Sequence, residues 1–339
     1  MLDPAASTTD YPRTVRTRFT ELVGCEAPIQ LAAMGGGIGT PRLAYAVAAA
    51  GGLGMVGASG FDRKTLVEAF DTRETRPAPE QHVGAGFLIP FVDRDIVAAV
   101  APLVQVIEFF YGDPDPVLVQ LGSSGGALVS WQVGSAAEAL AAAGAGCDFV
   151  IAQGVEAGGH VRGTIGVLML LDEVLAAVDL PVLAAGGVAT ARGLAAALAA
   201  GADGVRVGTR FLLAEESSAH PDYRASVIAA NAGDTVVTDA FNVNWPDAPH
   251  RVLRSSLDAA ANRTGDVSGA SYPGGEAIPL FAPSPPSDKI GGPIEALAHY
   301  AGESVSAATD VLPAADILRQ LAGGAEALLR HRTRDLGLA

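Results

Sequence analysis

A short segment in the middle of the chain concentrates side chains that could do chemistry. Residues 152–163 read Ala-Gln-Gly-Val-Glu-Ala-Gly-Gly-His-Val-Arg-Gly, which places an amide, a carboxylate, an imidazole and a guanidinium close together. The glycines beside His160 leave it few side chains to pack against, which favours a catalytic acid or base over a structural histidine. Glu156 and Arg162 could be site residues or charges on a solvated loop.

Other glycine-rich segments could hold a ligand by their backbone. The run Met-Gly-Gly-Gly-Ile-Gly-Thr at residues 34–40 is either a tight turn before a helix or backbone held close to a flat ligand. The pairs Gly186-Gly187 and Gly208-Thr209 each follow an apolar run. Their amides, with a short helix near Arg210, could bind a phosphate without a lysine, although two ordinary turns remain the alternative.

Other kinds of site lack support in the sequence. Neither a G-x-x-x-x-G-K-[ST] phosphate loop nor an H-E-x-x-H zinc motif occurs, and the remaining histidines lack metal-ligand spacing. A zinc hydrolase is therefore disfavoured. Cys25 and Cys147 are the only cysteines, too few for a disulfide framework, and we expect both to be buried thiols in a reducing compartment.

Apolar runs recur along the first two thirds of the chain and predict the elements that position these residues. Each run is followed by an Ala-rich segment of helical character. The candidate strands are residues 28–33, 53–57, 83–89, 104–109, 127–133, 149–153, 181–185 and 205–208. Their spacing fits a strand, a crossover helix and two loops, so consecutive strands should be parallel.

Helix-start signals fall between these strands. Thr40-Pro41 predicts an N-cap with proline at the first helical position, Ser135 with Glu138 has capping-box spacing, and Thr190 opens another helix. Eight strand-helix units predict an α/β fold, a closed (β/α)₈ TIM barrel, with an open doubly wound sheet as the alternative. In such a barrel the site lies at the C-terminal ends of the strands.

The alternation stops after Thr209. A helix is expected near 217–230, a loop at 239–250 and a closing helix near 314–332. The Pro/Gly/Ser-rich stretch 264–293 is interpreted as a long loop over the barrel mouth rather than a linker to another domain. The predicted organisation is an N-terminal extension (1–24), a ligand-binding (β/α)₈ barrel (25–216) and C-terminal helices with the long loop packed on the barrel (217–339).

Composition narrows the classes of partner. The chain has 339 residues and a net charge of −15, with 49% hydrophobic residues and 6% aromatic ones. This acidic balance disfavours nucleic acid and anionic membrane surfaces. The first ten residues are polar, without an apolar targeting segment, so a cytoplasmic protein is expected.

Five motifs, in order, resemble those of a known family. They are Ala-Ala-Met-Gly-Gly at 32–36, Ala-Ala-Gly-Gly-Leu-Gly at 49–54, the segment 152–160, Ala-Ala-Gly-Gly-Val at 184–188 and Val-Gly-Thr-Arg-Phe at 207–211. The sequence resembles the FMN-dependent nitronate monooxygenases, formerly called 2-nitropropane dioxygenases. These are related to flavin enoyl-acyl-carrier-protein reductases and NADH:quinone reductases.

The resemblance implies a TIM barrel with FMN at its mouth, and it assigns roles to particular residues. His160 matches the catalytic histidine. The implied cofactor-binding residues are Ala33, Met34, Gln153, Gly158, Gly159, Gly186, Gly187, Gly208 and Thr209, with the last four holding the phosphate.

The implied reaction is oxidation of alkyl nitronates by O₂. The alternative is an NAD(P)H-dependent reductase of a quinone or an enoyl thioester, and a different class is a non-catalytic barrel that binds a phosphate ligand. The expected partners are thus a small-molecule substrate and O₂, with NAD(P)H and a homo-oligomer left open.

This chain departs from the family pattern at two positions. Ala33 stands where family members usually have proline, and Gly86 stands at the position of an asparagine that contacts the flavin. Loss of that amide is expected to change the flavin potential or the substrate bound.

Overall fold

The barrel is closed. The computed structural model describes residues 15–58, 61–71 and 82–337, so the first 14 residues of the predicted N-terminal extension lie outside the described part. The barrel strands, in order, are β1 (Ile29–Leu31), β2 (Leu53–Gly57), β3 (His82–Leu88), β4 (Val106–Phe110), β5 (Leu128–Val133), β6 (Phe149–Gln153), β8 (Val182–Ala185) and β9 (Gly204–Val207). Strand β1 pairs in parallel with both β2 and β9, which excludes the open sheet. The eight predicted strands and the TIM barrel are confirmed.

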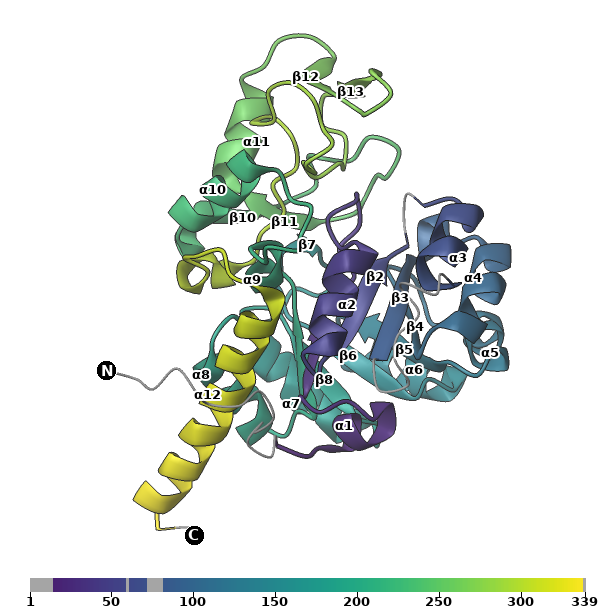
Figure 1. Cartoon of the computed structure of the whole chain (residues 1–339), viewed down its shortest axis with the longest axis vertical. Helices are drawn as coiled ribbons and strands as arrows, with labels where there is room; N and C mark the ends of the chain where they lie inside the picture. Colours follow the sequence, from purple (N-terminus) through teal and green to yellow (C-terminus); the bar gives the residue numbers. More distant parts are fainter. Residues whose placement is uncertain (1–14, 59–60, 72–81, 338–339) are drawn as a thin grey trace, which may run out of the picture.

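Helices separate the strands, as Figure 1 shows. They are α2 (Pro41–Ala49), α3 (Arg63–Asp71), α4 (Arg94–Val100), α5 (Pro116–Ser124), α6 (Ala136–Ala145), α7 (Val167–Ala177) and α8 (Ala191–Ala199). The helix α1 (Arg18–Val23) precedes β1, and the short α9 (Thr209–Leu212) follows β9. The barrel strands are almost entirely buried, as expected for parallel strands covered by helices.

The predicted helix starts are found with two differences in their side-chain bonds. Thr190 accepts from the amide of Gly193, and Pro41 is at the first helical position after Thr40, whose side chain makes no cap bond. Ser135 accepts from the amide of Glu138. The Glu138 carboxylate does not close the capping box, because it accepts from the Gly134 amide and from Arg162 instead.

The C-terminal part forms a second layer over the barrel mouth, at the top of Figure 1. It holds α10 (Pro221–Ala229), α11 (Arg254–Ala261) and a three-stranded antiparallel sheet of β10 (Thr235–Thr238), β11 (His250–Leu253) and β7 (Gly159–His160). Strand β7 comes from the segment after β6, so this sheet joins the second layer to the barrel.

Two C-terminal segments differ in detail from the expectation. The stretch 264–293 is not purely a loop, because β12 (Val267–Ser271) and β13 (Ala277–Pro279) form a hairpin within it. Its residues Pro283 and Pro285 reach the barrel mouth. The closing helix α12 (Ala314–Asp335) packs along the side of the barrel against α8 and α2.

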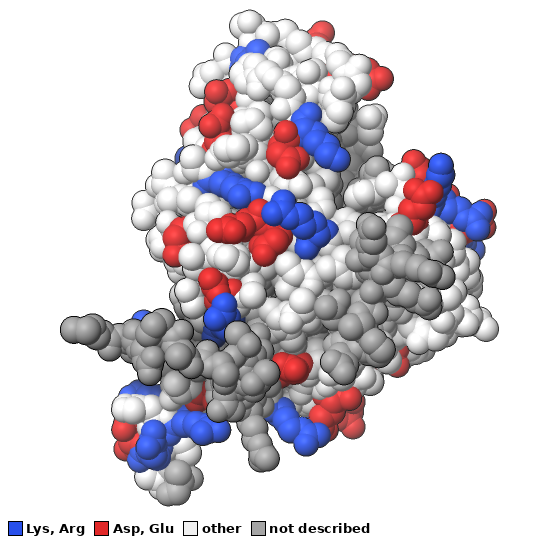
Figure 2. Space-filling model, in the orientation of Figure 1, with Lys and Arg blue, Asp and Glu red and all other residues white. Residues whose placement is uncertain are grey.

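The charged side chains on the face drawn in Figure 2 are mixed in sign, with acidic and basic groups side by side over the described surface. None of the described helices is both long enough and apolar enough to cross a bilayer. Both cysteines are free and buried, as predicted.

Candidate active site

A cavity of about 310 Å³ lies between the C-terminal ends of the barrel strands and the second layer. Barrel residues form most of its wall, and Trp245, Pro285 and Tyr300 close it from the C-terminal part. Every residue that the sequence singled out as catalytic or cofactor-binding lines this cavity: Ala33, Met34, Gln153, Gly158, Gly159, His160, Gly186, Gly187, Gly208 and Thr209. Residues more than 170 positions apart along the chain thus share one surface.

His160 does not lie on a free loop. It is the second residue of β7 and pairs with His250 of β11. The side chain of Gln153, at the end of β6, donates from Nε2 to the carbonyl oxygen of His160 at 2.9 Å. The histidine backbone is therefore fixed from the barrel and from the second layer.

Aromatic rings surround the imidazole of His160. It stacks on Trp245 with 3.9 Å between ring centroids and an interplanar angle of 24°, and Tyr111 meets it edge-on at 5.5 Å. Asn244 and Asp247, on either side of Trp245, have φ of 62° and 54°, and Tyr111 has φ of 64°. Asn and Asp tolerate the left-handed region, whereas a bulky side chain such as Tyr111 rarely adopts it, so the fold holds Tyr111 in place at a cost in backbone strain.

This environment keeps His160 neutral. Burial, with a smaller contribution from nearby His250, lowers the pKa of His160 to about 3. His250 is itself neutral, since its Nδ1 lies 2.8 Å from the carbonyl oxygen of Ala248 and its Nε2 accepts from the amide of Phe241. The Nε2 atom of His160 is buried and has no hydrogen-bond partner among the described residues.

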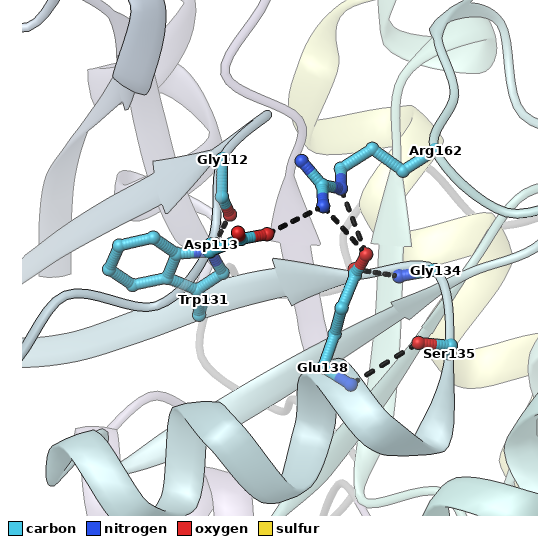
Figure 3. Close-up of polar contacts among 7 residues, drawn as sticks. All are labelled: Gly112, Asp113, Trp131, Gly134, Ser135, Glu138 and Arg162. Carbon is cyan, nitrogen blue, oxygen red and sulfur yellow. Dashed lines mark hydrogen bonds and ion pairs between the residues drawn. The ribbon is translucent and has the colours of Figure 1, made fainter.

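Arg162 anchors the segment that follows His160. Figure 3 shows its guanidinium between Glu138 at 2.9 Å and Asp113 at 3.1 Å. It also lies over the ring of Tyr111, at 5.9 Å from the centroid. Because it does not line the cavity, Arg162 positions the site without contacting what binds there.

Glu156 has a structural role. Both of its carboxylate oxygens accept from the amide of Val167, 3.0 Å away, at the first residue of α7. The carboxylate satisfies an orphan donor and complements the helix dipole there. Glu156 is absent from the cavity wall, so the structure does not bring it together with His160.

Glycines give the cavity an exposed backbone on one side. Gly186 and Gly187 have φ of 107° and 70°, which side chains rarely tolerate. Gly208 precedes α9, and Thr209 accepts at Oγ1 from the amide of Gly302 at 3.0 Å. This turn is therefore fixed by the C-terminal part while its backbone lines the cavity.

The two residues that depart from the family pattern, Ala33 and Gly86, lie against each other. A Cβ placed on Gly86 would collide with the Cβ of Ala33, and it would lie 3.4 Å from Oε1 of Glu108. Gly86 also pairs with Glu108 in the barrel sheet. The small residues at 33 and 86 therefore accommodate each other and leave the carboxylate of Glu108 at the cavity wall.

Three buried polar atoms on the cavity wall lack partners within the described chain. They are Oε1 of Gln153, Nε2 of His160 and the hydroxyl oxygen of Tyr300. Buried polar atoms are normally hydrogen-bonded, so this group is suited to a ligand that brings its own donors and acceptors. A flat, polar ring system such as a flavin, with a phosphate on the glycine backbone, fits both features.

The sequence interpretation missed several residues of the site. Tyr111 and Trp245 come from segments that carry no motif, and only the fold brings them to His160. Tyr300 begins the segment Tyr-Ala-Gly-Glu at 300–303, to which the family resemblance extends, but the resemblance assigns no role to it. Glu108 and Arg206 left a signal, because each is a charged residue within a strand expected to be buried, which requires a partner.

Comparisons with known proteins agree with this geometry. The family model for nitronate monooxygenase matches residues 81–323. The (3aS,4S,5R,7aS)-5-hydroxy-7a-methyl-1-oxo-octahydro-1H-indene-4-carboxyl-CoA dehydrogenase of Rhodococcus jostii RHA1 is 37% identical over 76% of this chain and 70% of that protein. A probable nitronate monooxygenase of Staphylococcus aureus JH9 is 29% identical over 67% and 76%.

Solved structures place the fold in the same group. FabK from Thermotoga maritima superposes with a TM-score of 0.77 at 30% identity, covering 94% of this chain and 98% of that one. The nitroalkane oxidase from Streptomyces ansochromogenes gives a TM-score of 0.72 at 27% identity, covering 93% and 99%. The chain belongs to the nitronate monooxygenase family and is a flavin-dependent oxidoreductase.

Proposed function

We propose that this enzyme binds FMN in the cavity and oxidises alkyl nitronates with O₂. The observation that carries this proposal is the neutral imidazole of His160, which lines the cavity with a buried, unpartnered Nε2. The family match to nitronate monooxygenase supports the same reaction class.

The cofactor-binding residues follow from the cavity wall. Backbone at Ala33 and Met34 would contact the ring system, with Gln153, Gly158 and Gly159 on the side of β6 and β7. The glycine pair after β8 and the turn at Gly208 and Thr209 would hold the phosphate. When bound, the flavin would accept electrons from the substrate and pass them to O₂.

The low pKa of His160 limits the form of the substrate. An imidazole whose conjugate acid has a pKa of about 3 is a poor base, so it would not remove a proton from a neutral nitroalkane at pH 7. It would hydrogen-bond to a nitronate that arrives already deprotonated. Trp245 and Tyr111 would orient the imidazole and exclude water around it.

Anaerobic mixing of the purified holoenzyme with four reagents tests this proposal. Ethyl nitronate is expected to bleach the flavin absorbance rapidly, whereas nitroethane, NADH and NADPH are expected to bleach it slowly or not at all. Rapid bleaching by NADH or NADPH without bleaching by the nitronate would contradict nitronate oxidation.

A second candidate is redox chemistry on an acyl thioester. It is favoured by the 37% and 35% identity to two carboxyl-CoA dehydrogenases. It is also favoured by charge: Arg206 is the only Lys or Arg on the described cavity wall, and it is paired with Glu108. A neutral thioester carbonyl needs no free cation. Reoxidation of the dithionite-reduced enzyme by an enoyl-CoA would support this candidate.

A further inference from the structure

A polar cluster crosses the inside of the barrel directly below the cavity. It consists of Gln30 of β1, Glu108 of β4, Gln132 of β5 and Arg206 of β9. The exposed fractions of these residues are 0%, 1%, 3% and 8%. Barrel interiors are normally filled by layers of branched apolar side chains, so a charged pair here needs a reason beyond packing.

The hydrogen bonds of this cluster define its charge state. Arg206 donates from Nη1 to Oε1 of Glu108 at 2.5 Å and also to Oε1 of Gln132. Gln30 donates from Nε2 to Oε2 of Glu108 at 2.9 Å. Burial raises the pKa of Glu108, whereas the charge of Arg206 and the hydrogen bonds from Arg206 and Gln30 lower it. Because both carboxylate oxygens accept and Arg206 faces them at 2.5 Å, the geometry is that of an ionised Glu108 paired with a cationic Arg206.

The cluster is open to the cavity. Glu108, Gln132 and Arg206 all line the cavity wall, whereas Gln30 does not. Gly86, beside Glu108 in the sheet, contributes no side chain that would cover the pair. A ligand in the cavity therefore meets two opposite charges in a setting shielded from water, where each has a strong and long-range effect.

Replacing a buried pair with apolar residues is often neutral or stabilising, so the pair is weak evidence for stability. Charge close to a flavin ring, in contrast, is one of the main determinants of its electronics. We propose that the Glu108–Arg206 pair sets the reduction potential of the bound flavin through the balance of its two opposite charges at the cavity wall, which cancel in the wild-type protein. This inference rests on the proposed flavin site.

The sign of the effect follows from the charge of the cofactor. Reduction adds electrons and makes the flavin more negative, so local positive charge stabilises the reduced form. Glu108→Gln removes a negative charge while keeping an acceptor for Arg206, and it should make the potential more positive. Gln132→Glu adds a negative charge on the same guanidinium, and it should make the potential more negative.

The double variant Glu108→Gln/Gln132→Glu moves the negative charge from position 108 to position 132 without changing the net charge of the cluster. The reduction potential of its flavin should therefore return close to that of the wild type. Asp203→Asn is the matched control. Asp203 is a carboxylate with 9% exposure that accepts from the amide of Val182 and lies outside the cavity wall, at the N-terminal end of β9. Its replacement should leave the potential unchanged.

The experiment is a dye-equilibrated measurement of the midpoint potential of FMN bound to these five proteins, with circular dichroism to verify folding. Glu108→Gln and Gln132→Glu are each expected to change the relative affinity for reduced and oxidised FMN at least tenfold. For a two-electron couple this is about 30 mV. The ratio of dissociation constants for the reduced and oxidised flavin provides the same quantity independently.

Equal potentials in all folded variants, or shifts of the same sign from Glu108→Gln and Gln132→Glu, would overturn the inference while leaving the flavin site standing. If Glu108→Gln fails to fold, the sign and size of the Gln132→Glu shift decide by themselves. A wild-type protein that binds no flavin would overturn the proposed function and this inference together.

Discussion

The imidazole of His160 stacks on the indole of Trp245, 3.9 Å away between ring centroids. His160 belongs to the segment after barrel strand β6, and Trp245 belongs to the loop before β11. The pairing of β7 with β11 brings the two together, so the second layer completes the environment of the barrel histidine.

Trp245→Leu should raise the pKa of His160. Burial is the main cause of the low value, and loss of the indole opens the imidazole to water. We expect an ionisation between about pH 3 and 6.5 in a histidine NMR titration of the variant, assigned with His160→Asn. Trp245→Phe keeps a ring against His160 and is the control. A titration unchanged in Trp245→Leu would show that the stack does not shield the imidazole.

His160→Asn should lower kcat/KM far more than it lowers FMN content. Loss of a hydrogen bond to a charged substrate group costs about 1.5–3 kcal/mol, which is roughly 10- to 150-fold. The phosphate would still be held by the glycine backbone after β8 and β9. Steady-state kinetics at a measured flavin content test this.

His299→Asn is the matched control for that variant. His299 is also buried and neutral, with a pKa lowered to about 4 mainly by burial, but it does not line the cavity. It should change kcat/KM less than twofold. Near-wild-type kinetics in His160→Asn would make His160 a structural residue.

Gly208→Ala should weaken flavin binding with little effect on folding. Gly208 has φ of −110°, outside the left-handed region, and its Cβ would lie 3.3 Å from the Cβ of Ala32, a tight contact that a shift of a few tenths of an ångström would relieve. The added methyl group would stand at the cavity wall where the phosphate is proposed to bind. We expect at least a tenfold rise in the Kd for FMN by fluorescence titration, about 1.4 kcal/mol.

Gly144→Ala is the control for that substitution. Gly144 lies in α6, and no atom is within 4 Å of a Cβ placed there. It should stabilise the helix by about 0.5–1 kcal/mol and leave the Kd for FMN unchanged. An FMN affinity in Gly208→Ala equal to that of the wild type would show that the phosphate does not bind at this turn.

Stability should fall as the pH drops from about 6.5 toward 4. His160 and His299 have folded-state pKa values of about 3 and 4, below the value near 6.5 expected in the unfolded chain. In this window the unfolded state binds more protons, so each histidine lowers the free energy of unfolding by about 1.4 kcal/mol per pH unit. Above pH 6.5 their contribution is constant.

Urea unfolding at pH 7, 6 and 5 measures this dependence. His299→Asn removes one of the two groups. Below pH 6.5 it should therefore reduce the slope of the free energy of unfolding against pH by about 1.4 kcal/mol per pH unit, the contribution of one proton. A variant with the wild-type slope would show that His299 is protonated in the folded protein.

The barrel could be predicted from sequence because its determinants are local. Each strand is a short apolar run, and helix starts such as Ser135 and Thr190 are read from a few neighbouring residues. The glycine-rich strand ends also identified one side of the cavity, since the C-terminal ends of parallel strands meet at the same place.

The rest of the site depends on contacts between distant segments. Nothing local to Trp245 indicates that it stacks on His160, because the contact is created by the pairing of β7 with β11. The sequence left open whether Glu156 and Arg162 are site residues or charges on a solvated loop. In the structure Glu156 accepts from the amide of Val167, and Arg162 is paired with Asp113 and Glu138.

The flavin content of the purified protein tests the central claim most directly. The protein should be yellow, and denaturation should release FMN rather than FAD, in a ratio close to one per chain by absorbance and chromatography. A colourless protein that does not bind added FMN in an equilibrium titration would contradict the account.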